Sequence, residues 1–149
     1  MSTPRDPDFE RRVRESFMRQ KFMATLGATL DVVRAGEIHI GFAHRDELTQ
    51  QHGYLHAGVL AAVADSACGY AALSLMEPGT GVLSIEFKIN MLAPAVGERF
   101  LAVGRVVRSG RTITVCSADV SAHHEGATVQ VALMQATMMA VRGRKGLSD

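Results

Sequence analysis

The sequence contains no tryptophan, and all aromatic side chains together make up 5% of its 149 residues. So few aromatic residues argue against the stacking platforms that bind single-stranded nucleic acid. The chain also lacks an excess of either charge, because 16 basic and 15 acidic side chains give a formal net charge of +1. Without a strong field of one sign, the protein is not expected to be drawn to nucleic acid or to a membrane surface.

Cysteine is almost absent. Cys68 and Cys116 are too few for a disulfide framework, and their spacing is not that of a metal site. Both lie among small apolar residues, which predicts buried free thiols. The segment 1–20 is polar and charged and has no apolar core of the secretory-leader type, so we expect a cytoplasmic protein without a metal.

The sequence does have one long stretch with a single charge, Asp65, between Ala57 and Met76. A bilayer needs about 20 apolar residues to be crossed, so by length this stretch could span one. Alanine and glycine dominate it, however, and an ionised aspartate at mid-span would cost about 2.5–3.5 kcal/mol. We therefore expect no membrane span but a helix buried on all sides inside a soluble protein.

The hydrophobic patterns predict a single domain over residues 1–149. An amphipathic helix is predicted at about residues 8–24 and a polar, frayed tail at 143–149. The apolar helix begins near 56–58 and ends by Pro78–Gly79. Strands are predicted around it at 29–33, 37–42, 82–92, 100–108, 111–122 and 128–141. This order indicates an α+β protein with one curved antiparallel sheet wrapped around the central helix.

The predicted strand at 82–92 has a period of two, which gives it an apolar and a polar face. The apolar face comprises Ile85, Phe87, Ile89 and Met91. The polar face comprises Ser84, Glu86, Lys88 and Asn90.

The segment Gln50–Gly58, with the sequence Gln-Gln-His-Gly-Tyr-Leu-His-Ala-Gly, is the most informative part of the chain. The spacing of three features resembles that in the hotdog-fold thioesterases: the amide of Gln50, the His-Ala-Gly sequence at 56–58 and the carboxylate of Asp65. The resemblance extends through residues 81–94 and the Ser-Gly-Arg turn at 109–111, and in all it covers residues 25–141. Within these thioesterases the chain resembles the PaaI-like (phenylacetate-degradation) branch of acyl-CoA thioesterases. One departure is Ala57, where that branch has glycine; alanine keeps the backbone N–H and only reduces backbone freedom.

The resemblance implies a hotdog fold and a hydrolase that cleaves an aryl- or medium-chain acyl-CoA, with coenzyme A as part of the substrate and no other cofactor. Asp65 would be the nucleophile or the general base, since a carboxylate in a dry environment is more reactive than a solvated one. The N–H groups of Ala57 and Gly58, at the start of the central helix, would form the oxyanion site.

Three further side chains take a role from the same resemblance. His56 would hydrogen-bond the thioester region or orient the loop, Gln50 would donate its amide N–H to the substrate carbonyl or to a water, and Ser84 would position the attacking water. Each also has an ordinary interpretation, as a helix-entry histidine, a solvated loop amide and a polar strand position. The turn formed by Arg108, Gly110 and Arg111 would meet the phosphates of coenzyme A, although such arginines are usually solvated surface.

Asp65 and His56 are about 13 Å apart along the predicted helix. One chain therefore cannot easily bring both to the same thioester, whereas two chains packed antiparallel at these helices can. We accordingly expect a dimer or a dimer of dimers with sites at the interface.

Two other functions remain open. A non-catalytic acyl-CoA binding module would keep the pocket, and Ala57 in place of glycine leaves room for this interpretation. An enoyl-thioester hydratase or dehydratase shares the fold but pairs a histidine with an acid differently. Its histidine lies well upstream in a His-Phe-Pro-like sequence, and neither His39 nor His44 lies in such a sequence.

Overall fold

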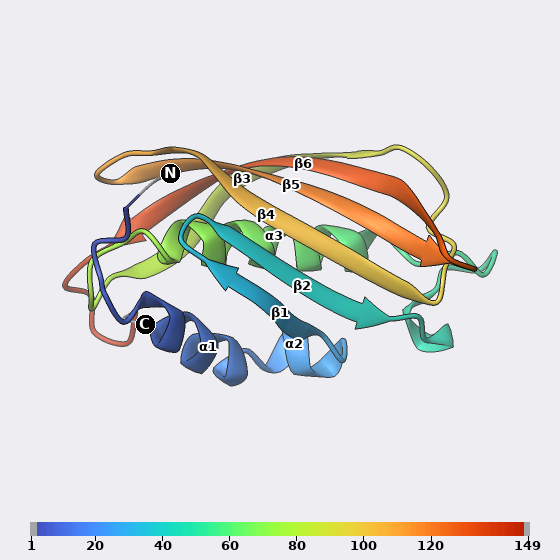
Figure 1. The fold of residues 1–149 in the computed structure, drawn as a ribbon, viewed down its shortest axis with the longest axis horizontal. Coiled ribbons are helices and arrows are strands. Elements are labelled where there is room, and N and C mark those ends of the chain that lie inside the picture. The colour runs from blue at the N-terminus through green and yellow to red at the C-terminus, as the bar shows by residue number, and fades with distance from the viewer. Residues whose placement is uncertain (1–2, 148–149) are drawn as a thin grey trace.

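The computed structural model describes residues 3–147, in which a six-stranded antiparallel sheet curves around one long helix, α3, Ala57–Leu73 (Figure 1). Two helices, α1 (Phe9–Arg19) and α2 (Lys21–Thr25), precede the sheet, and a short 3-10 helix, η1 (Asp46–Leu48), precedes α3. The strands are β1 (Thr29–Arg34), β2 (Glu37–Ala43), β3 (Gly81–Met91), β4 (Arg99–Ser109), β5 (Ile113–His124) and β6 (Ala127–Val141). Their order in the sheet is β1-β2-β4-β5-β6-β3, which confirms the predicted α+β architecture.

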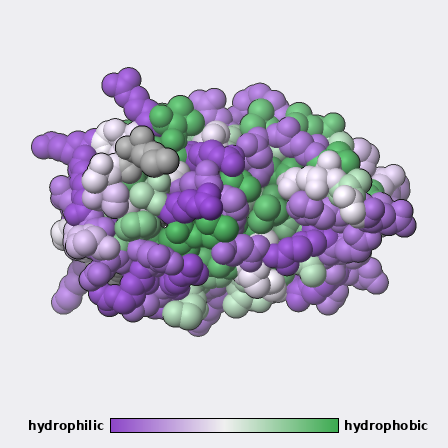
Figure 2. All heavy atoms as spheres, in the orientation of Figure 1, coloured by the Kyte–Doolittle hydropathy of each residue, from purple (hydrophilic) through white to green (hydrophobic). Residues whose placement is uncertain are grey.

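The small residues of α3 let the sheet come close to it. A Cβ atom at Gly104, on β4, would collide with the backbone of Ala67 on α3, so only glycine allows this approach. Inward-facing residues of the strands, such as Phe42 and Phe100, complete the core on the concave side and stack with ring centroids 5.3 Å apart. On the face shown in Figure 2, hydrophilic and hydrophobic side chains are interspersed.

The prediction that the central helix is buried on all sides is wrong for the single chain. Gly58, Ala62, Asp65 and Gly69 are half-buried or exposed, and they recur at helical spacing on one stripe of α3. The sheet and α1 pack against the other faces of α3 and cover this open stripe only in part. Among residues 3–147, no helix has both the length and the hydropathy to cross a membrane.

The N-terminal helix expected at 8–24 is broken in two at Gln20. Its backbone is extended there (φ −79°, ψ 94°), and α2 begins at the next residue. The Gln20 side chain accepts a hydrogen bond from Ser66 Oγ of α3, at 3.2 Å. Periodicity did not reveal the break because buried apolar residues, Val13 and Met23, lie on both sides of it.

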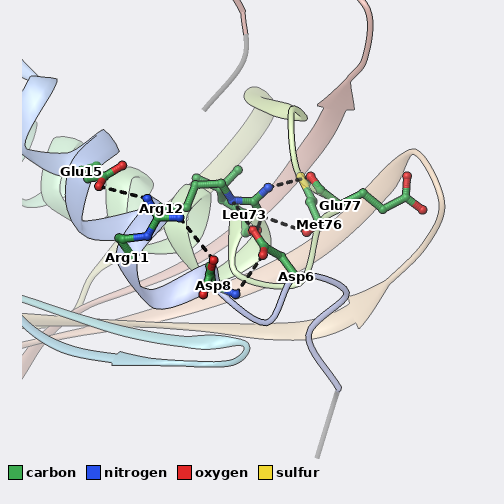
Figure 3. Close-up of polar contacts among 8 residues, drawn as sticks. All are labelled: Asp6, Asp8, Arg11, Arg12, Glu15, Leu73, Met76 and Glu77. Atoms are coloured by element: carbon green, nitrogen blue, oxygen red, sulfur yellow. Dashed lines mark hydrogen bonds and ion pairs between the residues drawn. The ribbon is translucent and has the colours of Figure 1, made fainter.

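Arg12 attaches α1 to the end of the central helix (Figure 3). Its guanidinium donates to the carbonyl oxygens of Leu73, Met76 and Glu77 at 2.9, 2.8 and 2.6 Å. It also pairs with the carboxylate of Asp6 at 3.3 Å, and both side chains are nearly buried. The last carbonyls of a helix have no partner within the helix, and Leu73 is the last residue of α3. Arg12 thus binds one such carbonyl and two in the loop that follows, and so fixes the position of α1.

The strict alternation predicted for β3 is wrong, because a β-bulge interrupts its pairing with β6 between Ser84 and Glu86. Ser84 pairs with Met138 and, beyond the bulge, Phe87 pairs with Ala136; both β6 partners are fully buried. The extra residue, Ile85, shifts the alternation by one position. As a result Ser84 shares the helix-facing side with Phe87, not the outer side with Glu86.

Candidate functional site

Asp65 and Ser84 are in direct contact. Asp65 projects from the middle of α3, and its Oδ1 accepts a hydrogen bond of 2.7 Å from Ser84 Oγ on β3. Ser84 also lies 3.4 Å from the Met138 sulfur of β6. In the single chain the Asp65 side chain is half-buried, so the expectation of a dry position is wrong for the isolated protomer.

A cavity of about 400 Å³ lies beside this pair. Its walls come from α1, α3 and the strands β3 and β6. Its lining includes Ser16 and Arg19 of α1, Gln20 at the break that follows, and Ser66, Gly69 and Tyr70 of α3. The cavity is thus a mixed polar and apolar chamber that opens next to a carboxylate.

Gln50 and Ala57 lie together elsewhere, in a second cavity of about 440 Å³ near the start of α3. Met91 at the end of β3 and Pro94 contribute to its lining. The Gln50 side-chain oxygen accepts a hydrogen bond from the backbone N–H of His52. This bond engages the amide oxygen and leaves the NH₂ group of Gln50 as its donor.

His56 is the N-cap of α3, and this has a consequence for the predicted oxyanion site. Its Nδ1 accepts the backbone N–H of Gly58 at 2.8 Å, which places the proton of a neutral imidazole on Nε2. The Gly58 N–H therefore already has a partner in the single chain. The Ala57 N–H is the other donor predicted at this helix end.

The predicted site residues thus form two separate groups. Asp65 and Ser84 are in contact at one cavity, whereas Gln50 and Ala57 line the other. Asp65 and Ala57 are about 12 Å apart along the same helix. The structure of one chain does not bring the two groups together.

The basic turn lies at the end of the sheet where β3 begins. Leu83, Met139 and Ile113 are aligned across β3, β6 and β5, and Arg111 precedes Ile113 by two residues. Gly110 donates its N–H to Ile113 O at 2.9 Å, and a Cβ at Gly110 would come within 2.6 Å of the same oxygen. The tight turn therefore explains this glycine. Arg108 and Arg111 are exposed and line neither cavity.

Both cysteines are buried, as predicted. Removal from water raises the pKa of the Cys68 thiol well above its usual range and that of Cys116 to about 12. Neither sulfur is a nucleophile at neutral pH. Within residues 3–147, no three acidic, histidine or cysteine side chains lie together as metal ligands would.

Sequence reasoning missed the part of the Asp65 cavity contributed by other elements. Gly69 lies one helical turn after Asp65, so helical spacing alone could have identified it. Ser16 of α1 and Gln20 after it had no such signal, because their proximity to Asp65 depends on how α1 packs on α3. Met138 is placed there by the pairing of β6 with β3.

Comparison with known proteins gives matches in sequence and in structure. The family model described as the thioesterase superfamily matches residues 52–129. A protein of Saccharolobus solfataricus named as an esterase is 32% identical over 80 residues, which are 54% of this chain and 56% of that protein. The chain therefore matches little more than half the length of this curated relative.

Solved structures give longer matches. A thioesterase family protein from Silicibacter pomeroyi is 50% identical, with a TM-score of 0.90 over 91% of this chain and 99% of that one. The E. coli PaaI protein, from the phenylacetic acid degradation operon, is 18% identical, with a TM-score of 0.80 over 91% of this chain and 95% of its own. At that identity the second match supports the fold alone.

Proposed function

This chain belongs to the thioesterase superfamily, and from that premise we propose that it hydrolyses the thioester of an aryl- or medium-chain acyl-CoA. The products would be the free acid and coenzyme A. The observation that carries the proposal is the Asp65 carboxylate, held by Ser84 at 2.7 Å and open to a cavity of about 400 Å³. A carboxylate beside a chamber that can hold an acyl group has the reactivity and the space that thioester hydrolysis needs.

Asp65 can act in either of two ways. As a general base it takes a proton from water, the water oxygen attacks the thioester carbonyl, and the proton passes to the sulfur as the C–S bond breaks. As a nucleophile it attacks the carbonyl itself, forms a mixed anhydride and releases the thiolate, after which water cleaves the anhydride. In both routes the Ser84 hydroxyl holds Oδ1 of Asp65 and so orients the carboxylate for reaction.

The thioester oxygen gains negative charge in either route and needs hydrogen-bond donors. The Ala57 N–H at the start of α3 and the NH₂ group of Gln50 line one cavity and are suited to this task. His56 would keep this helix end in place through its bond to Gly58. Because these donors lie too far from Asp65 of the same chain, we propose that a second copy supplies them.

Two surfaces support such a dimer. β3 is an edge strand with exposed apolar side chains, of which Ile85 is 51% exposed and Phe87 44%. A long apolar edge strand is rare unless it pairs with another chain. The open stripe of α3, which includes Asp65, is also only partly covered. Antiparallel pairing of two copies would place the Gln50–Gly58 segment of each chain opposite Asp65 of the other, which gives two such sites in a dimer and four in a dimer of dimers.

Coenzyme A would extend from the site toward the basic turn. Arg108 and Arg111 are exposed, and guanidinium groups suit phosphate recognition. The turn lies at the same end of the sheet as Ser84. The thiols of Cys68 and Cys116, buried and unpaired, fit the reducing cytoplasm that we propose as the location.

The hydratase alternative finds no support in the positions of the histidines. His39 bonds Glu37 at 2.8 Å, but these residues alternate with the fully buried Ile38 and Ile40 and therefore face away from α3. His44 lines neither the Asp65 cavity nor the Gln50 cavity. We therefore retain hydrolysis as the proposal.

A panel of aryl and straight-chain acyl-CoA thioesters, assayed for released thiol, tests this function. The wild-type protein should cleave at least one class, and Asp65→Asn should lower kcat by about a hundredfold or more, as expected for loss of a general base. Absence of hydrolysis across the panel would reject the proposal. Coenzyme A binding without turnover would favour the binding module instead.

A further inference from the structure

Gly69 lies inside α3, about one turn before its end at Leu73, although no contact within the single chain requires a glycine there. A Cβ at Gly69 would meet no atom within 4 Å, in contrast to Gly104, where a Cβ would collide with α3. Its φ lies outside the left-handed region, so the backbone does not require glycine either. Glycine lowers the stability of a helix interior relative to alanine. Contacts and backbone geometry within the single chain thus give no reason for glycine at this position.

The empty space beside Gly69 belongs to the Asp65 cavity. Gly69 follows Asp65 by four residues, so the two lie on the same face of α3, about 6 Å apart along the helix axis. Both line the cavity of about 400 Å³, with Tyr70 next to Gly69 and Met138 contributed by β6. A side chain at position 69 would project into this cavity close to the carboxylate.

We propose that Gly69 determines the width of the acyl pocket and so admits acyl groups that carry a ring or a branch near the carbonyl. The inference rests on the proposed thioesterase function and adds a specificity residue to it. The space is sufficient for such a group, because a dry apolar cavity of about 150 Å³ is enough to bind benzene. A straight acyl chain occupies less of the width beside Gly69 and depends on it less.

The test compares Gly69→Ala and Gly69→Leu with the wild-type dimer or tetramer, using benzoyl-CoA and butyryl-CoA as probes. Gly69→Leu should lower the ratio of kcat/KM for benzoyl-CoA to that for butyryl-CoA by about tenfold or more, and Gly69→Ala by a smaller factor. Gly69→Ala should also raise the Tm by about 2–4 °C, because it removes a helix-interior glycine. A more stable variant with a narrower substrate range is not expected from a merely structural role.

Ala24→Leu is the matched control. Ala24 is exposed on α2, lies outside the open stripe of α3 and lines neither cavity, so added bulk there should leave the substrate ratio unchanged. Sedimentation of all variants shows whether assembly is altered. An unchanged ratio in both Gly69 variants, an equal shift in Ala24→Leu, or dissociation of Gly69→Ala would each overturn the inference. Wild-type protein that cleaves no acyl-CoA of any kind would instead refute the thioesterase proposal itself.

Discussion

Ser84 on β3 donates a hydrogen bond of 2.7 Å to the carboxylate of Asp65 on α3. The contact exists because the β-bulge after Ser84 keeps that residue on the helix-facing side of the strand while Phe87, beyond the bulge, faces the same way. Bulges often occur next to active sites, where they redirect a side chain. Here the extra residue, Ile85, places the Ser84 hydroxyl and the Phe87 ring on the same side of one strand.

Removing the Ser84 hydroxyl should slow the reaction without greatly weakening substrate binding. A hydrogen bond to a charged group contributes about 1.5–3 kcal/mol, so Ser84→Ala should lower kcat by about tenfold to a hundredfold. Ser84→Thr keeps the hydroxyl and should recover most of the rate. Steady-state kinetics on one cleaved acyl-CoA measure this, and full kcat in Ser84→Ala would exclude a role for the bond in catalysis.

Arg12 should matter for stability more than any exposed arginine on the same helix. Arg12→Met removes the hydrogen bonds to the carbonyls of Leu73, Met76 and Glu77 and takes the ion-pair partner away from Asp6, which should cost about 2–4 kcal/mol. The matched control is Arg11→Met, since Arg11 is exposed and makes only surface ion pairs. Urea denaturation of both variants measures the difference, and equal midpoints would contradict this function of Arg12.

Glu37 should contribute to stability above the acid range. The hydrogen bond from His39, followed by that from Arg105, holds the pKa of this carboxyl below its usual value. Because its pKa is lower in the folded state, ionised Glu37 stabilises the protein at pH values above its pKa in the unfolded state, about 4.3. This stability is lost as the pH falls through the folded-state pKa. Glu37→Gln should therefore reduce stability at pH 7 and flatten its decline in acid.

Thermal unfolding at several pH values measures this dependence. Glu47→Gln, on the exposed 3-10 helix, serves as the control and should keep the wild-type profile. A Glu37→Gln profile parallel to that of the wild type would show that the Glu37 ion pairs do not stabilise the fold.

The sequence was sufficient to predict the sheet, the central helix and their order, because each of these elements has a local periodicity. It could not predict the break at Gln20 or the bulge after Ser84, since both arise from contacts between elements distant in sequence. The same limit applies to the site. Asp65 stands out as a lone charge in an apolar helix. Its contact with Ser84, and the hydrogen bond from Arg12 to Leu73 O, exist only in the folded chain.

The central claim is that a working site combines Asp65 of one chain with Gln50 of another, and mixed dimers test it most directly. Asp65→Asn and Gln50→Ala should each be impaired as pure proteins. Refolded together in equal amounts, they should recover about a quarter of the wild-type activity, because in a two-fold dimer each heterodimer regains one intact site. Activity no higher than the mean of the two pure variants would contradict a site shared between chains.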